Sequence, residues 1–333
     1  MNYKNINLEK SMYKTGNKDF TAVLESLDPS ENYKGTELES LDAYQRQLKR
    51  FDIKVSGPES DIVEKFFINA ESAILFPEYI SRAITQGINW ANILPEIIAT
   101  RIKIHGIDYR PIQSVTSDLP SGITTNAVAE GASLREVNIT TDPNLVKLIK
   151  HGRTLSCSYE ALRHQNLETL TVILRKIGSD IADEQFEDVL EVLEKNAFKI
   201  DVSGLSDGNL SYENLLKIWE ALSPYQLNIM LASTSSVRSI LALPEIKDTV
   251  SGMNFKSTGR LITPLGAQLI RVNLISGNVV YGLDKNFALQ MIQSGGILID
   301  YDKVIDRQLE KSAITITTGF AKFFGNTIVK LIY

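Results

Sequence analysis

The sequence contains one cysteine, three histidines and no long apolar run. Because Cys157 stands alone, no disulfide can form within the chain, which fits a reducing compartment. The histidines His105, His151 and His164 are not at spacings typical of a zinc site, so we expect no bound metal. The apolar stretches are far shorter than the roughly 20 residues of a membrane span. The polar N-terminus also has no apolar centre of the kind found in secretory signals.

Positive charge is also scarce. The chain has 35 Lys and Arg against 40 Asp and Glu, a net charge of -5. A protein that holds nucleic acid by neutralising phosphates needs a concentrated basic surface, so the composition argues against that class. With 43% hydrophobic and 23% charged residues, the 333-residue chain is typical of globular proteins. It can bury a full core in one large or two modest domains.

Catalytic motifs are missing as well. The glycines of "GLSDGN" and "QSGGIL" are not followed by Gly-Lys-Ser or Gly-Lys-Thr, so they form no phosphate loop. Cys157 precedes a predicted helix, where the dipole favours a thiolate, and two histidines are near in sequence. However, "CSY" matches no nucleophile elbow or thiol-protease signature. The acid pair Glu187 and Asp188 is interpreted as surface charge. We therefore predict no enzyme activity, no catalytic residue and no cofactor.

The N-terminal third predicts an arm followed by helices. Residues 1 to about 35 show little periodicity and predict an extended arm with one short helix near "FTAVLESL". A helix is predicted from Thr36, its capping residue, to Phe51. One apolar stripe along that helix carries Leu41, Tyr44, Leu48 and Phe51. "SDIVEKFF" opens a further helix.

The segment from 101 to 144 predicts strands. "RIKIHGIDYRPI" alternates in strand fashion, with a bulge at Gly106. Residues 117 to 144 are polar and small, and their few apolar positions predict a long two-stranded hairpin. An isolated hairpin is marginal in water, so we expect it to lie on another surface.

A long helix and a compact α/β region follow. Leucines and isoleucines recur at helical spacing over about 37 residues from Ser158, or roughly 55 Å of helix. Between 205 and 296 we predict the following elements: a capped helix in "SYENLLKIWEAL", a buried strand in "NIMLAS", a helix in "TSSVRSILAL", a strand pair about residues 276–278 and a short helix in "KNFALQMIQSGG". In the last strands, Ile314, Ile316 and Phe320 alternate with threonines, and a strand so apolar on one side needs a covering layer.

Much of this material is suited to lying on another surface. An extended arm, an amphipathic helix, a polar hairpin and an unusually long helix leave apolar stripes and unpaired edges in a lone molecule. Self-assembly is the simpler explanation.

The order of these elements resembles the major capsid protein of tailed bacteriophages, with the Hong-Kong-97-type fold. The match runs from about residue 70 to 333 and is carried by "LFPEYISRAI", "VAEGASLREVNI", "SYEALRHQNLETLTVILRKIGSDIADEQFEDVLEVL" and "YGLDKNFALQMIQSGGILIDYDKVIDRQLEKSAITITTGFAKFF". The resemblance implies an α+β fold with these parts: an N-terminal arm with an amphipathic helix (1–70), the entry and first strand of a peripheral domain (71–116), an extended loop (117–144), the rest of the peripheral domain with its spine helix (145–204), an axial α/β domain (205–296) and terminal strands that return to the peripheral domain (297–333).

The resemblance also implies a function. It points to a non-enzymatic capsid protein of a tailed phage or prophage, whose hexamers and pentamers form an icosahedral shell. That shell would enclose double-stranded DNA without sequence-specific binding and without a membrane. The location would be the virion, and the host cytoplasm during assembly; scaffolding, portal and decoration proteins are the further partners it implies. An encapsulin-type nanocompartment shell and a soluble α/β enzyme centred on 205–296 are the alternatives.

Candidate subunit-interface residues fall in two places. The extended loop supplies Glu130, Gly131, Arg135 and Glu136, with Gly131 suited to a tight turn. The predicted amphipathic helix supplies Leu41, Tyr44, Leu48 and Phe51.

Some members of this family join their subunits covalently through a lysine in the extended loop. Residues 117 to 144 contain no lysine, so we predict a shell held by non-covalent contacts alone. Assembled particles run on a denaturing gel should give only the 37.1 kDa band of the single chain. A ladder of covalent oligomers would contradict this.

Overall fold

The computed structural model describes residues 6–14, 19–115, 130, 138–141, 143–203, 210–247 and 261–333. The chain divides into two compact units. The first unit contains Met1–Asn92, His151–Glu184 and Ile297–Ile316, and the second contains Ile93–Lys150, Gln185–Gly296 and Thr317–Tyr333. Within the described residues, no helix combines the length and the apolar character needed to cross a bilayer.

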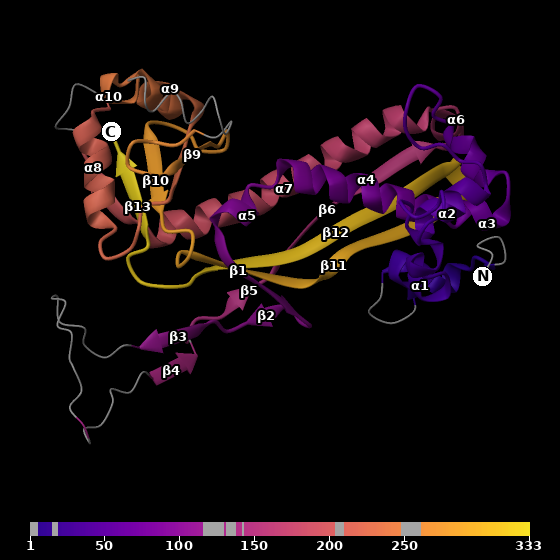
Figure 1. Cartoon of the computed structure of the whole chain (residues 1–333), viewed down its shortest axis with the longest axis horizontal. Helices are drawn as coiled ribbons and strands as arrows, with labels where there is room; N and C mark the ends of the chain where they lie inside the picture. Colours follow the sequence, from indigo (N-terminus) through magenta and orange to yellow (C-terminus); the bar gives the residue numbers. More distant parts are fainter. Residues whose placement is uncertain are drawn as a thin grey trace. The chain divides into compact units, whose positions relative to one another are not determined.

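The N-terminal part of the first unit is mostly helical (Figure 1). Its elements are η2 (Lys10–Lys14), α1 (Phe20–Leu27), η3 (Ser30–Tyr33), α2 (Ala43–Arg50), η4 (Val63–Phe67), α3 (Ala70–Ala73) and α4 (Phe76–Ala91). The short helix predicted near "FTAVLESL" is confirmed as α1. The helix predicted from Thr36 starts later, because Asp42 is the cap: its carboxylate accepts from Gln45 N at 2.8 Å. The Thr36 hydroxyl instead donates to the carbonyl of Tyr33 at 2.7 Å, within a turn.

The described part of the predicted arm is not extended. Leu8, Phe20 and Leu24 are buried in one core cluster with residues of α4. Beside that cluster, Arg46 is fully buried, and its Nε donates to Asp28 Oδ2 at 2.8 Å. Further donors of this guanidinium reach the Leu41 carbonyl at 2.7 Å and the Ser30 hydroxyl at 3.0 Å. A buried charge so fully bonded ties this segment into the unit's own interior.

The predicted 37-residue helix is interrupted near its start. The structure has α6 (Tyr159–Arg163) and then α7 (Leu167–Asn196), a helix of 30 residues or about 45 Å. Ser158 accepts from Ala161 N at 3.2 Å and starts α6, as predicted. Asn166 then accepts from Glu168 N at 2.8 Å and starts α7, while its amide donates to Ser60 O at 3.0 Å. An asparagine that bonds local backbone competes with helix continuation, which explains the break.

Two glycines allow α4 and α7 to cross closely in the first unit (Figure 1). A Cβ atom on Gly178 would meet the carbonyl oxygen of Ile84 and lie 2.8 Å from the Ile88 nitrogen. A Cβ atom on Gly87 would meet the backbone of Arg175. Because both obstacles are helix backbone, neither can move aside cheaply.

A four-stranded sheet has the order β1-β11-β12-β6, formed by β1 (Ile98–Ile104), β11 (Leu289–Val304), β12 (Leu309–Lys322) and β6 (Ile149–Ser158). The strands β11 and β12 are linked by η5 (Ile305–Arg307). The predicted alternation in β12 is confirmed up to Thr317, because Ile314 and Ile316 are buried and Thr315 and Thr317 are only half-buried. From 318 to 321 every residue is buried, Phe320 among them. The helix predicted over "KNFALQMIQSGG" is wrong: from Leu289 on, these residues are strand β11, paired in parallel with β1. Sheet pairing outweighs local helix propensity there.

The strand β4 (Asn138–Thr141), within the predicted polar hairpin, pairs with β3 (Ile112–Val115), which precedes the hairpin in the sequence. The two strands run antiparallel, with Ser114 opposite Ile139. The flanking strands also pair: β2 (Asp108–Tyr109), which precedes β3, runs antiparallel to β5 (Val146–Lys147), which follows β4. Gly106, the predicted bulge, lies between β1 and β2 with φ of 148°. Of the hairpin predicted over 117–144, only residues 130, 138–141 and 143–144 are described, and the rest of that prediction lies outside the described residues.

The second unit is built on a five-stranded sheet of order β7-β13-β10-β8-β9. Its strands are β7 (Phe198–Asp201), β13 (Ile328–Ile332), β10 (Val279–Leu283), β8 (Ile229–Ala232) and β9 (Gln268–Arg271), and its helices besides α7 are α5 (Leu94–Ile97), α8 (Tyr212–Ala221), α9 (Thr234–Ala242) and α10 (Pro244–Lys247). Met230, Val280 and Leu331 pack on α8 and α9. Leu231 and Tyr281, on the other face, pack with the C-terminal residues of α7.

Two strand predictions in this region need correction, and three element predictions hold. The C-terminal strand β13 lies inside the five-stranded sheet rather than in the four-stranded sheet with β11 and β12. The strands β9 and β10 are not a pair about residues 276–278, because β8 lies between them. Helices α8 and α9 and the buried strand β8 occur where the sequence predicts them.

Replacing Gly178 by Ala should destabilise the first unit by about 1–3 kcal/mol, because the new methyl group forces α4 and α7 apart. Gly325→Ala is the matched control, since a Cβ atom there meets nothing within 4 Å. Urea unfolding followed by circular dichroism measures both variants. Equal midpoints for Gly178→Ala and the wild type would contradict the close crossing.

Candidate functional site

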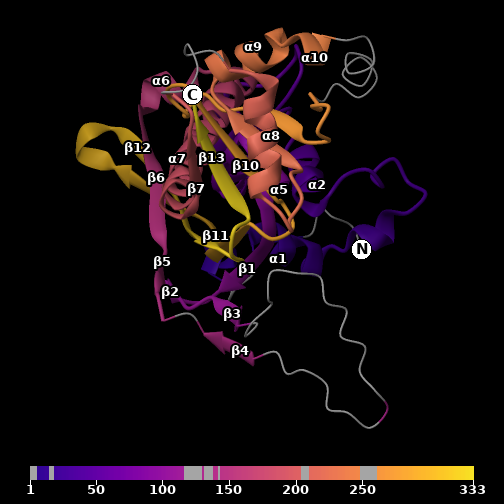
Figure 2. The ribbon, with the colours of Figure 1, turned by 90° about the vertical axis from the view of Figure 1, so that its left-hand side faces the viewer.

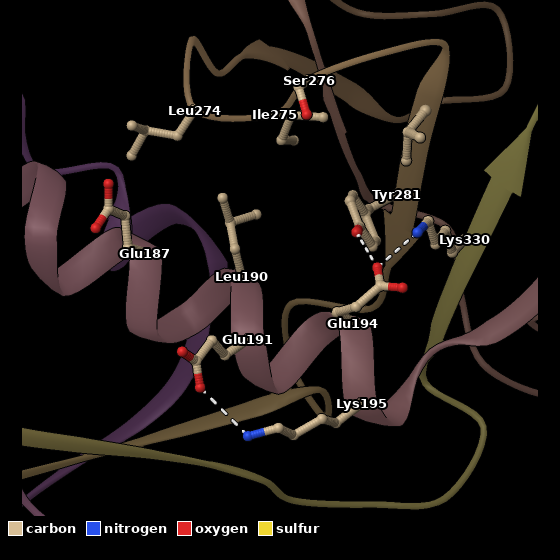
Figure 3. A pocket seen from close by; sticks show the side chains of 11 residues that line it. Glu187, Leu190, Glu191, Glu194, Lys195, Leu274, Ile275, Ser276, Tyr281 and Lys330 are labelled. Atoms are coloured by element: carbon tan, nitrogen blue, oxygen red, sulfur yellow. Dashed lines mark hydrogen bonds and ion pairs between the residues drawn. The ribbon is translucent and has the colours of Figure 1, made fainter.

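A cavity of about 420 Å³ opens in the second unit beside the C-terminal part of α7 (Figure 3). Its apolar lining consists of Leu190, Leu274, Ile275 and Val279. Its charged lining consists of Glu187, Glu191, Glu194, Lys195 and Lys330. Two of the carboxylates are already paired inside the unit, Glu194 with Lys330 and Glu191 with Lys195.

Glu194 is the centre of a network that joins α7 to three strands. Its carboxylate accepts from Lys330 Nζ at 2.6 Å and from Tyr281 OH at 2.8 Å (Figure 3). It also accepts from Lys199 Nζ at 3.0 Å. The bond from Lys330, with those from Tyr281 and Lys199, lowers the pKa of Glu194 to about 2 and outweighs partial burial. Burial, together with this carboxylate, raises the pKa of the Tyr281 hydroxyl. A carboxylate held as an anion by three donors is suited to fixing strands in place, not to proton transfer.

A second hollow, of about 650 Å³, lies at the C-terminal end of α8. Trp219, Pro224, Tyr225 and Leu265 give it an aromatic and apolar wall. The loop beneath is held by Asp284, a buried carboxylate that accepts from Gln226 N and Asn228 Nδ2, both at 2.9 Å. The hollow is therefore preformed.

The residues considered for chemistry do not assemble into a reactive centre. Burial, with the charge of Glu310, raises the pKa of the Cys157 thiol, whereas an activated nucleophile needs a lowered one. His151 Nδ1 lies 3.5 Å from a carboxylate oxygen of Glu184, which also pairs with Arg153. Across the described ranges, no group of three or more His, Cys, Asp or Glu side chains is placed to hold a metal ion.

The predicted interface residues of the amphipathic helix face the unit's own interior. Tyr44 and Leu48 are buried in the core cluster, and Phe51 packs against it. The Tyr44 hydroxyl donates to the Leu75 carbonyl at 3.1 Å. Leu41 is half-buried. The helix does have the predicted apolar stripe, but other parts of the same unit cover it. These side chains therefore offer little surface to a neighbour.

The predicted interface residues of the extended loop are mostly not placed. Glu130 is exposed. Gly131, Arg135 and Glu136 lie outside the described residues. They remain predictions.

Sequence reasoning missed the two tryptophans. The chain has only two, and both are exposed: Trp90 by 82% and Trp219 by 56%. Tryptophan is highly buried on average and is enriched in binding hot spots, so exposure of both is informative. A signal existed for Trp219, since it lies off the stripe of Leu215, Ile218 and Leu222 that α8 buries.

Comparison with known proteins identifies the fold. No family model and no curated protein matches the sequence. Among solved structures, the virus-like particle from Pyrococcus furiosus is similar with a TM-score of 0.53 and 13% identity, over 76% of this chain and 98% of that chain. The capsid of the native GTA particle has a TM-score of 0.53 and 12% identity, over 72% and 88%. The capsid of the cyanophage P-SCSP1u has a TM-score of 0.51 and 10% identity, over 72% and 88%. The chain therefore has the α+β fold of these shells, and the predicted Hong-Kong-97-type fold is confirmed.

Replacing Glu194 by Gln should lower the melting temperature at pH 7. A carboxyl whose pKa falls on folding contributes stability above its ordinary pKa of 4.5 and loses it as the pH falls toward about 2. The difference from the wild type should therefore shrink below about pH 4.5. Glu191→Gln is the control on the same helix, because its ion pair with Lys195 is exposed. A difference that stays constant from pH 7 to pH 3 would contradict the lowered pKa.

Proposed function

We propose that this chain is the major capsid protein of a tailed phage or prophage. Copies of it would assemble, as hexamers and pentamers, into an icosahedral shell that encloses double-stranded DNA. The observation that carries the proposal is the fold shared with three shell structures, which covers 72–76% of this chain and 88–98% of theirs.

Open strand edges support assembly. In the five-stranded sheet, β7 and β9 are the outer strands, and in the four-stranded sheet β1 and β6 are. Part of β9 is already covered, because Leu269 N donates to the Leu261 carbonyl at 2.7 Å. Outer strands present unpaired backbone groups that another chain can satisfy. Exposed large apolar side chains add to this need for cover; the most exposed of them are Trp90, Ile305, Ile107, Ile139, Ile68 and Leu298.

The charge balance suits a container. A net charge of -5 disfavours tight binding of phosphates, so the enclosed DNA would be confined rather than gripped. Each standard interface of about 1,600 Å² supplies moderate affinity, and closed symmetry multiplies it over the shell. On this proposal the chain has no catalytic role, and its location is the virion, with the host cytoplasm as the place of assembly. Scaffolding, portal and decoration proteins are its further proposed partners.

A second candidate is an encapsulin-type nanocompartment shell. The virus-like particle from Pyrococcus furiosus favours it, because 98% of that chain is covered. Such a shell would enclose a cargo protein rather than DNA. Among the described residues, no observation favours the alternative of a soluble enzyme.

Expression of the full chain should yield closed particles or ring-shaped capsomers by negative-stain microscopy. In size-exclusion chromatography these should elute far ahead of a 37.1 kDa monomer. Nuclease-protected DNA in particles from the native host would support the phage capsid, and a stoichiometric cargo protein would support the nanocompartment. A chain that stays monomeric at micromolar concentration would refute both.

A further inference from the structure

Two helices cover opposite ends of one face of the five-stranded sheet. Helix α8 packs on the end formed by β7 and β13, and α9 packs on the end formed by β8 and β9. Both bury their inner sides in the same core, through Leu215 and Ile218 of α8 and Val237 and Ile240 of α9. Figures 1 and 2 show them as separate helices of the second unit. Their outer sides are therefore two separate surfaces of this unit.

The outer side of α8 is apolar and acidic. Trp219 is 56% exposed and Leu216 is 39% exposed. Trp219 also lines the preformed hollow of about 650 Å³. Glu213 and Glu220 are exposed beside them, and neither carboxylate has an ionic partner among the described residues. We call this surface the α8 face.

The outer side of α9 is apolar and basic. Leu241 is 39% exposed, and Arg238 is exposed one turn before it, with no ionic partner in the described part of the chain. Arg271, at the end of β9, is exposed too and alternates to the same side of the sheet as buried Leu269. An exposed acid, Glu245, follows Leu241 in sequence and lies on α10. We call the surface of Arg238, Leu241 and Arg271 the α9 face.

We propose that the α8 face of one copy binds the α9 face of a second copy. In this contact Leu241 enters the hollow beside Trp219, and Arg238 pairs with Glu220. A tryptophan at the centre of a preformed hollow, with a charged pair at its margin, has the arrangement of a binding hot spot. The inference rests on the proposed shell function and names a contact within it.

Complementary charge selects this pairing over a symmetric one. Two α8 faces against each other would bring Glu213 and Glu220 near their own copies, and like charges across an interface are costly. Joining unlike faces is a heterologous contact, which leaves one α8 face and one α9 face free in every pair. Repetition of such a contact closes into a ring when the rotation allows it.

Tryptophan fluorescence tests the contact directly. In a Trp90→Phe background, Trp219 is the only tryptophan of the chain. Its emission should move to shorter wavelength as protein concentration rises and the contact forms, because the exposed indole becomes buried. Adding Trp219→Tyr to a chain that keeps Trp90 provides the matched control. Emission from Trp219 that does not change while copies associate would overturn the proposal.

Charge reversal tests the pairing. Glu220→Arg and Arg238→Glu should each weaken association at least about 30-fold, as loss of a hot spot does. The double variant with both changes should regain association, since the opposite charges meet again. Glu31→Arg, an exposed acid of η3 in the first unit, is the control and should assemble like the wild type. Circular dichroism of each variant confirms that the chain folds.

The outcomes separate this inference from the proposed function. If the wild type forms particles and both single reversals do so equally well, the α8–α9 contact is wrong while the shell function stands. If the wild type forms neither particles nor capsomers, the shell function fails, and the contact is judged by the Trp219 emission and the rescue in whatever smaller oligomer forms. Weakening by both single variants without rescue in the double variant would overturn the pairing of Arg238 with Glu220.

Discussion

The burial of one side of α7 is the constraint on which the architecture depends. Leu170, Leu174 and Ile181 of this helix lie in the core of the first unit, and Val189 and Leu193 lie in a core of the second. In proteins, most of the stability of a helix comes from tertiary packing of one side. The 30-residue helix α7 therefore needs packing along its whole length. Each unit supplies that packing with its own partners, α4 in the first and the five-stranded sheet in the second. The helix is thus a shared element around which two separate interiors form.

Much of the fold could be predicted because local patterns and tertiary packing agree. The alternation around Ile314, the capped helix α8 and the buried strand β8 each have one dominant signal, and each forms as predicted. The failures occur where a distant partner decides. Residues from Leu289 carry a helix-compatible pattern, yet pairing with β1 makes them strand. The place of β13 in the five-stranded sheet depends on β7 and β10, far away in sequence, and no local pattern reveals it.

The candidate site was harder to predict than the fold, for a related reason. An apolar stripe tells that a helix face is covered but not what covers it. Tyr44 and Leu48 were assigned to a neighbour, yet the chain's own α4 region covers them. Trp219 shows the converse: it lies off the buried stripe of its helix, and only the three-dimensional structure reveals the hollow beside it. The similar shells share only about 10–13% identity with this chain, so the likeness lies in the fold.

The buried ion pair of Arg46 and Asp28 affects how a copy of the chain associates with its neighbours. The guanidinium, Asp28 and the ring of Tyr33, 4.4 Å beneath it, hold the N-terminal segment against its own body. The segment around Arg46 is therefore part of the body of the first unit, so a copy can dock onto a neighbour or leave it without this segment unfolding.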